Sequence, residues 1–127
     1  MNFTIAKECT ILSDEEKITF PEVVSCLHKA GIESYYADLL MPNKTFYFEN
    51  TAFTINCSLS TKKVADFFNP QGIAAAIREI QTGQIKYQEF IRKIMDAGVI
   101  SYMVFIKGQK TIYFGRKGEQ HAEEFSK

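Results

Sequence analysis

The sequence has few of the residues from which metal and catalytic sites are built. It contains two histidines, His28 and His121, three cysteines and no tryptophan. Neither histidine has a Cys, Asp or Glu at the spacing of a metal site, and no GxSxG, GxGxxG, HExxH or phosphate-loop pattern occurs. We therefore predict no metal and no cofactor. The sequence assigns no catalytic residue, and whether the protein is an enzyme stays open.

Cysteine and long hydrophobic runs are also scarce. Cys9, Cys26 and Cys57 are odd in number and widely spaced, which excludes a disulfide framework and a CxxC pair. Because free cysteine is usually buried, we expect three reduced thiols in the core. No apolar run approaches the roughly 18 residues of a membrane-spanning helix, and the first residues do not resemble a signal peptide. We expect a cytoplasmic protein without a membrane partner.

Charge of one sign is not in excess. Lys plus Arg and Asp plus Glu both number 15, so the chain has no net positive field to attract nucleic acid. Lys107, Lys110, Arg116 and Lys117 are basic and near aromatic residues, but acidic residues of the same tail offset them. The hydrophobic content of 46% and the length of 127 residues predict one folded domain.

The clearest pattern that is present is an internal repeat, in which Ile18–Leu39 aligns without gaps with Ile85–Ile106. The identical pairs are Ile18/Ile85, Glu22/Glu89, Ala30/Ala97, Gly31/Gly98, Ser34/Ser101 and Tyr35/Tyr102. If one residue is dropped from the second hairpin turn, Lys44–Phe48 aligns with Lys110–Phe114. The repeat predicts two pseudo-symmetric halves of one domain, about residues 1–60 and 61–127, linked by Thr61–Phe68.

Each half is predicted to contain a helix that ends in the same way. Thr19 and Glu22 have the spacing of a capping box, whereas Lys86 takes the place of Thr19 in the second half. Gly31 and Gly98 follow the last apolar helical positions, as the left-handed residue after a helix does. Another helix precedes each of these two. Its segments are Asn2–Leu12 and the stretch after the Asn69-Pro70 cap.

Three strands are predicted after each glycine. In the first half they are Glu33–Leu40, Lys44–Phe48 and Phe53–Leu59, and in the second half the last one is Glu119–Phe125. The alignment places Phe46 and Phe48, or Ile112 and Phe114, on one face. The predicted fold class is α+β, an internally duplicated helix-helix-strand-strand-strand unit whose mainly antiparallel sheet has helices packed on one face.

The other face of this sheet is predicted to be unusually apolar. Its side chains are Tyr36, Asp38, Tyr47, Met103, Phe105 and Tyr113. Such a face either packs against a partner or the chain itself, or lines a ligand pocket. Near the C-terminus, Arg116, Glu119 and His121 would lie along one rim of a hairpin. An anion-binding rim and an ordinary charged hairpin both fit that pattern.

Three segments resemble a known family. They are Phe20-Pro-Glu-Val-Val24, Ala30-Gly-Ile-Glu-Ser-Tyr-Tyr-Ala-Asp-Leu39 and Tyr113-Phe-Gly-Arg-Lys-Gly-Glu-Gln-His121. These motifs are similar to those of the YbcV-like bacterial proteins, a family of unknown function often labelled phage envelope protein because some members lie in prophage regions. In that family an Asp commonly follows the second-half Tyr-x-Val, where this chain has Phe105, whereas the first half keeps Asp38. The resemblance implies no mechanism.

The sequence leaves two hypotheses of function open. The first is a non-enzymatic protein-interaction or homodimeric binding module that uses the apolar sheet face. The alternative is a small-molecule-binding protein or enzyme with a pocket at the seam between the two halves. The residues proposed for that pocket are Tyr36, Asp38, Tyr102, Tyr113, Arg116, Glu119 and His121.

Overall fold

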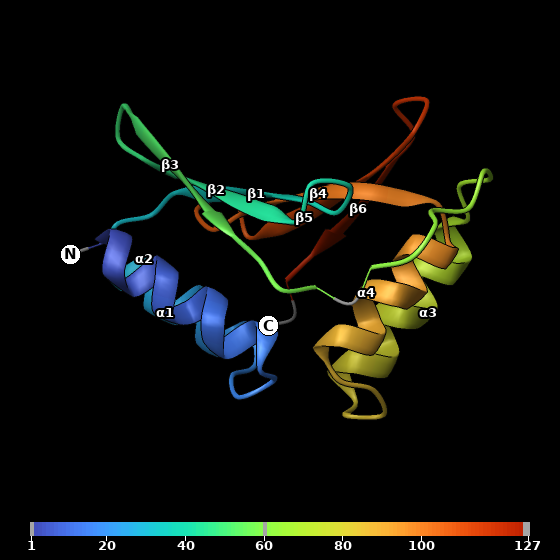
Figure 1. The fold of residues 1–127 in the computed structure, drawn as a ribbon, viewed down its shortest axis with the longest axis horizontal. Helices are drawn as coiled ribbons and strands as arrows, with labels where there is room; N and C mark the ends of the chain where they lie inside the picture. Colours follow the sequence, from blue (N-terminus) through green and yellow to red (C-terminus); the bar gives the residue numbers. More distant parts are fainter. Residues whose placement is uncertain (1, 60, 126–127) are drawn as a thin grey trace.

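A computed structural model describes residues 2–59 and 61–125 of the chain. The order of elements is helix, helix, strand, strand, strand, and this order occurs twice (Figure 1). The elements are α1 (Asn2–Asp14), α2 (Phe20–Lys29), β1 (Ser34–Asp38), β2 (Asn43–Phe48), β3 (Thr51–Asn56), α3 (Pro70–Gln81), α4 (Tyr87–Asp96), β4 (Val99–Phe105), β5 (Lys110–Gly115) and β6 (Gln120–Glu124). Every element is one that the sequence predicts.

The six strands form one antiparallel sheet in the order β3-β2-β1-β4-β5-β6. The two halves therefore meet at the centre, where Tyr36 of β1 lies opposite Met103 of β4. Both helix pairs, α1 with α2 and α3 with α4, lie on the same side of the sheet (Figure 1). The predicted α+β class, with helices packed on one face, is confirmed. Among the described residues, no helix has the length and apolar character needed to cross a membrane.

The helix ends follow the predicted chemistry. At the start of α2 the backbone N–H of Thr19 donates to Oε1 of Glu22 at 2.8 Å, while the Glu22 N–H donates to the Thr19 hydroxyl at 3.4 Å. The Thr19 N–H and hydroxyl also lower the pKa of Glu22, because both stabilise its carboxylate. Lys86 at the start of α4 makes no side-chain cap. Gly31 and Gly98 have φ angles of 83° and 90°, which glycine adopts without strain.

The predicted pairing of the second hairpins is wrong by one residue. Tyr35 lies opposite Phe46 in the first half, and Tyr102 lies opposite Tyr113 in the second. Phe46 and Tyr113 are therefore equivalent, and no residue is dropped from the second turn. Because neighbouring side chains of a strand point to opposite faces, this shift moves Tyr113 to the helix side and Ile112 and Phe114 to the other side. The matching letters of Lys44–Phe48 and Lys110–Phe114 do not reflect equivalent places.

The chain between the halves packs under the sheet. We call residues 61–69 the linker. Its Val64 is 1% exposed, and its Ala65 and Asn69 N–H groups donate to the carbonyls of Met95 and Ala97 at 3.0 and 2.8 Å. The linker thus covers the end of α4.

The predicted core thiols are only partly confirmed, because Cys9 is buried whereas Cys57 is half-buried and Cys26 is exposed; all three are free.

Candidate functional site

The seven residues predicted to line a seam pocket lie on both sides of the sheet. Tyr36 and Asp38 point away from the helices, since Tyr35 and Ala37, which alternate with them along β1, face the core. Asp38 stabilises the turn after β1, where its Oδ1 accepts hydrogen bonds from the N–H groups of Leu40 and Met41 at 2.9 and 3.0 Å. It is therefore separated by the sheet from the helix-side residues of the predicted pocket.

Three of the seven residues, Tyr102, Tyr113 and His121, lie together on the helix side. The ring centroids of Tyr102 and Tyr113 are 5.6 Å apart, and those of Tyr113 and His121 are 6.3 Å apart. His121 Nε2 lies 3.3 Å from Oε1 of Glu123. These contacts form a row of aromatic rings across β4, β5 and β6.

Arg116 and Glu119 belong to the turn between β5 and β6. Glu119 Oε1 accepts a hydrogen bond from the N–H of Lys117 at 2.8 Å and so stabilises the turn. Arg116 Nη2 donates to the carbonyl of Val64 at 3.4 Å and so holds the linker. The structure therefore brings together Tyr102, Tyr113 and His121, but it does not gather all seven residues around one cavity.

A buried lysine that the sequence analysis did not select lies beside this row. Lys44 of β2 is 4% exposed and points to the helix side. Its Nζ lies 5.0 Å from the ring centroid of Tyr87 and 5.7 Å from that of Tyr35. The hydroxyls of Tyr87 and Tyr102 are 3.1 Å apart. We call Lys44, Tyr35, Tyr87 and Tyr102 the lysine–tyrosine cluster. The sequence did contain a signal for this burial: side chains alternate along a strand, and Lys44 lies two residues before the buried Phe46.

The electrostatics of the cluster keep Lys44 charged and the tyrosines neutral. Burial is the largest single effect and lowers the pKa of Lys44, but the summed electrostatic interactions with the ionisable groups around it outweigh burial, and the pKa is raised. Burial also raises the pKa of Tyr35, Tyr87 and Tyr102 above the ordinary value of 10.0. At neutral pH the cluster is therefore an ammonium group among protonated phenols, and cation–π contact is its main direct stabilisation.

Two polar atoms at this place, Nζ of Lys44 and Oδ1 of Asp14, make no hydrogen bond to the described residues. The Oδ1 atom of Asp14 is also buried. The other oxygen of Asp14, Oδ2, accepts from the N–H of Ser58 at 2.8 Å. Burial raises the pKa of the neighbouring Cys57 thiol to about 11, so this cysteine is a neutral thiol at neutral pH. The cluster combines a buried cation with an unsatisfied carboxylate oxygen.

The sheet face opposite the helices, which we call the open face, is apolar along its central strands. Its large apolar side chains are Tyr36, Tyr47, Met103, Phe105, Ile112 and Phe114. Tyr47 is 36% exposed and the others are half-buried. The predicted members are confirmed except Tyr113, which is 7% exposed on the helix side because of the register shift described above. Ile112 and Phe114 take its place.

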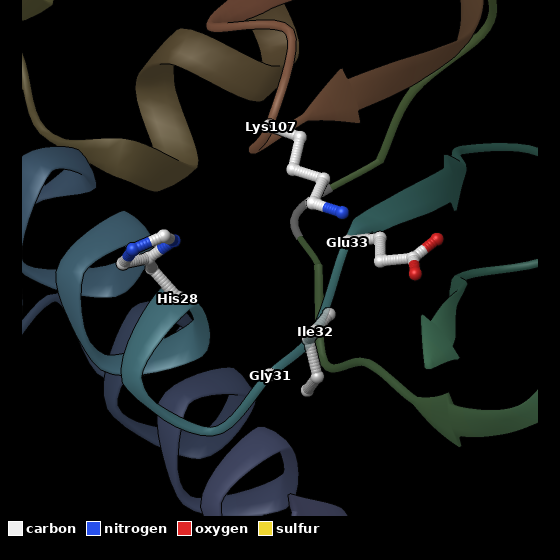
Figure 2. Close-up of a pocket in the computed structure, with 5 residues that line it drawn as sticks. All are labelled: His28, Gly31, Ile32, Glu33 and Lys107. Carbon is white, nitrogen blue, oxygen red and sulfur yellow. The ribbon is translucent and has the colours of Figure 1, made fainter. Parts of the chain in front are cut away.

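Two grooves lie beside α2. One, with a volume of about 250 Å³, is lined by His28, Gly31, Ile32, Glu33 and Lys107; we call it the His28 groove (Figure 2). The other, of about 280 Å³, lies between α1 and α2 and is lined by Ile5, Glu8, Cys9, Leu12, Ile18, Cys26 and Lys29. In the part of the chain that the structure describes, no group of three or more His, Cys, Asp or Glu side chains is placed to hold a metal ion.

These features define a small α+β protein with a six-stranded sheet that is covered by helices on one side and open on the other. The chain belongs to the family described as "Protein of unknown function (DUF1398)", which it matches over residues 10–124. A comparison with curated proteins finds no match.

Proposed function

We propose that this protein is a non-enzymatic binding module that forms a homodimer through its open face. One observation carries this proposal: the described chain places no helix over the open face, yet its central strands present Tyr36, Met103, Phe105, Ile112 and Phe114. An antiparallel sheet with one solvated face normally carries polar side chains there. A contiguous apolar patch of this kind is typical of a surface that binds another protein.

The character of the open face favours a second copy of the chain as the occupant. The antiparallel pair β1 and β4 lies at its centre, so the face has an approximate twofold arrangement that suits the isologous interface of a symmetric dimer. Both signs of charge occur on it, with Asp38 and Glu124 against Lys110, and the zero net charge of the chain causes no repulsion. Six strands of five to seven residues give a footprint of roughly 500 Å² per copy, which predicts a weak dimer.

Sedimentation equilibrium tests the homodimer directly. We expect the mass to rise from one chain toward two as the concentration increases to about 500 µM, the range for a weak interface. Phe105→Glu should keep the protein monomeric, because it places a charge within the apolar patch. Phe67→Glu is the matched control, since Phe67 is 84% exposed and lies in the linker. A wild-type chain that stays monomeric throughout this range would overturn the proposal.

A small-molecule site at the lysine–tyrosine cluster is a second candidate, which we propose on a separate observation. The buried Oδ1 of Asp14 accepts no hydrogen bond, which costs free energy, and the nearby Lys44 ammonium has no acceptor among the described residues. A small molecule with a carbonyl oxygen and an N–H group, such as a primary amide, has the acceptor and the donor that these two groups lack. This candidate site shares Tyr102 with the pocket predicted from the sequence. Tyr113 and His121 of that pocket lie in the adjoining row of aromatic rings.

Trifluoroacetamide is a probe for this second candidate, and its 19F resonance reports binding. We expect the resonance to broaden with the wild-type chain and to stay sharp with Lys44→Met. Lys110→Met is the control, because Lys110 is exposed at the start of β5. If the wild-type chain leaves the resonance sharp, the candidate is excluded.

The more specific YbcV-like identity within the family also remains a proposal, and it rests on the three sequence motifs.

A further inference from the structure

The two glycines that end α2 and α4 hold equivalent places but have different neighbours. Gly98 is buried under the linker, and a Cβ atom added to it would lie 2.9 Å from Cα of Phe68. Gly31 is exposed, and a Cβ atom added to it would meet only the ring of Phe48, at 2.9 Å. The surface over the helix end is therefore filled by backbone in the second half and free of it in the first.

The linker shows how an extended segment binds to such a helix end. The N–H groups of Ala65 and Asn69, four residues apart, donate to the carbonyls of Met95 and Ala97 at 3.0 and 2.8 Å. This contact leaves Met95 only 1% exposed and Ala97 only 4% exposed. Backbone hydrogen bonds supply the binding, so the same geometry is available to other sequences.

The His28 groove is the open counterpart of this site. The residues equivalent to Met95 and Ala97 are His28 and Ala30, by the spacing that relates Gly98 to Gly31. Their carbonyls accept no hydrogen bond from another segment of the described chain. His28 is exposed and Ala30 is half-buried, in contrast to their buried counterparts. The first half therefore retains the acceptors and the space without the segment that uses them.

The charge of the groove differs from that of its filled counterpart. His28 and Lys107 line it, and the residues at the equivalent places, Met95 and Leu40, are apolar. Neither His28 nor Lys107 forms an ion pair with the described residues. In Figure 2, Lys107 extends from the turn after β4 toward the segment that carries Gly31, while the carboxylate of Glu33 points away from His28. Because the Glu33 carboxylate is turned away, Lys107 is the charged group that faces the groove, and it favours a negatively charged segment.

A further difference restricts the size of one side chain. The Phe68 ring of the linker lies beside Gly115, where a Cβ atom would be 2.7 Å from its Cδ1. The first half has Phe48 at the place of Gly115, and this ring already lies over Gly31. A segment in the His28 groove therefore needs a small residue at the position that corresponds to Phe68.

We propose that the His28 groove binds an extended, acidic peptide segment of a partner protein. Two backbone N–H groups of this segment, four residues apart, donate to the carbonyls of His28 and Ala30. The N–H groups of the linker donate to Met95 and Ala97 in the same way. An acidic side chain between them faces His28 and Lys107, and a small residue lies next to Phe48. This binding site is separate from the open face, and it does not depend on dimer formation.

The chain itself provides the sequence of a probe. We choose an acetylated, amidated peptide with residues 64–70, which contains Asp66, and with the change Phe68→Ala. On titration into the full-length protein, we expect NMR shift changes at the backbone amides of Gly31, Ile32 and Lys107. The peptide that keeps Phe68 should bind more weakly, and so should one with Asp66→Lys.

Charge reversal in the protein supplies the matched control. Lys107→Glu should weaken binding about fivefold, the usual size for a partly exposed charge contact, whereas Lys110→Glu, on the same hairpin with the same change in charge, should leave binding unchanged. An equal loss in both variants would overturn the proposal. So would shift changes confined to Met95 and Gly98, which would mean that the peptide displaces the linker. Shift changes at Gly31 on concentrating the protein without peptide would assign the groove to a second copy and also contradict the proposal.

Discussion

At the residue scale, the close approach of the linker backbone to Gly98 predicts that glycine-to-alanine substitutions differ in their cost to stability. Gly98→Ala combines a left-handed φ of 90° with overlap against the backbone of the linker, which cannot move without breaking its hydrogen bonds. We expect a loss of about 3 kcal/mol in the free energy of unfolding. Urea denaturation of the variant measures this loss.

Two other glycines provide the controls. Gly83 has a φ of 77° but nothing within 4 Å of an added Cβ atom, so Gly83→Ala should cost only about 1 kcal/mol. Gly31→Ala should fall between the two, because the Phe48 ring can shift whereas backbone cannot. Equal losses at Gly83 and Gly98 would show that the linker does not pack against Gly98 as described.

The lysine–tyrosine cluster shows what the sequence could and could not reveal about single residues. Tyr102 is recognisable as a core residue from alternation along its strand, and Lys44 would have been recognisable in the same way. A lysine is rarely fully buried without a partner, so the residue type of Lys44 favours a prediction of surface exposure. Its contact with the Tyr87 ring and its electrostatic interaction with Asp14 involve distant segments, and no local pattern in one sequence predicts them.

At the scale of elements, the missing cap of α4 predicts a stabilising change. Lys86 has φ and ψ of −105° and 178°, close to the −93° and 161° of Thr19, so its backbone is already in the capping conformation. Glu89 lies three residues later, as Glu22 does after Thr19. Lys86→Thr should therefore complete a capping box and raise the free energy of unfolding by about 0.5–1 kcal/mol.

The control for this change is Lys86→Ala, which removes the lysine without adding a cap. Thermal and urea denaturation of both variants should place Lys86→Thr above the wild type and Lys86→Ala near it. If both variants gain equally, removal of the lysine charge is the cause and the capping explanation is wrong.

The elements also show why the sequence predicted the fold better than the site. Helix ends are local, so Thr19, Gly31 and Gly98 were readable from short patterns, and the element order followed. Strand register depends on pairing between segments, and the chance match of Lys44–Phe48 with Lys110–Phe114 favoured the wrong one. That one-residue error moved Tyr113 to the open face in the prediction.

At the scale of the whole molecule, the two halves share one sheet and one core. β1 and β4 pair along their length at the centre of the sheet. Gln88 of α4 donates hydrogen bonds to the carbonyls of Asp14 and Ser58 at 2.9 and 3.0 Å, which joins the helix pairs across the seam. We therefore propose that residues 1–127 unfold as a single domain rather than as two halves.

Alkaline unfolding tests this proposal, because the buried tyrosines come from both halves. Burial raises the pKa of Tyr35, Tyr87, Tyr102 and Tyr113 above the ordinary value of 10.0. Below pH 10 both states keep these protons, whereas at higher pH the unfolded chain loses them and the folded chain does not. Stability is thus fully present below about pH 10 and falls as pH rises, by about 1.4 kcal/mol per pH unit for each tyrosine.

We expect tyrosinate absorbance and far-ultraviolet circular dichroism to change together in one steep transition above pH 10. Tyr35→Phe should move the midpoint to higher pH, because it removes one of the linked protons, and the Tyr35 hydroxyl makes no hydrogen bond to the described residues that would be lost. Tyrosine ionisation without loss of helix would mean that the phenols are accessible in the folded state. Two separate transitions would mean that the halves unfold independently, in spite of the strand pair that joins them.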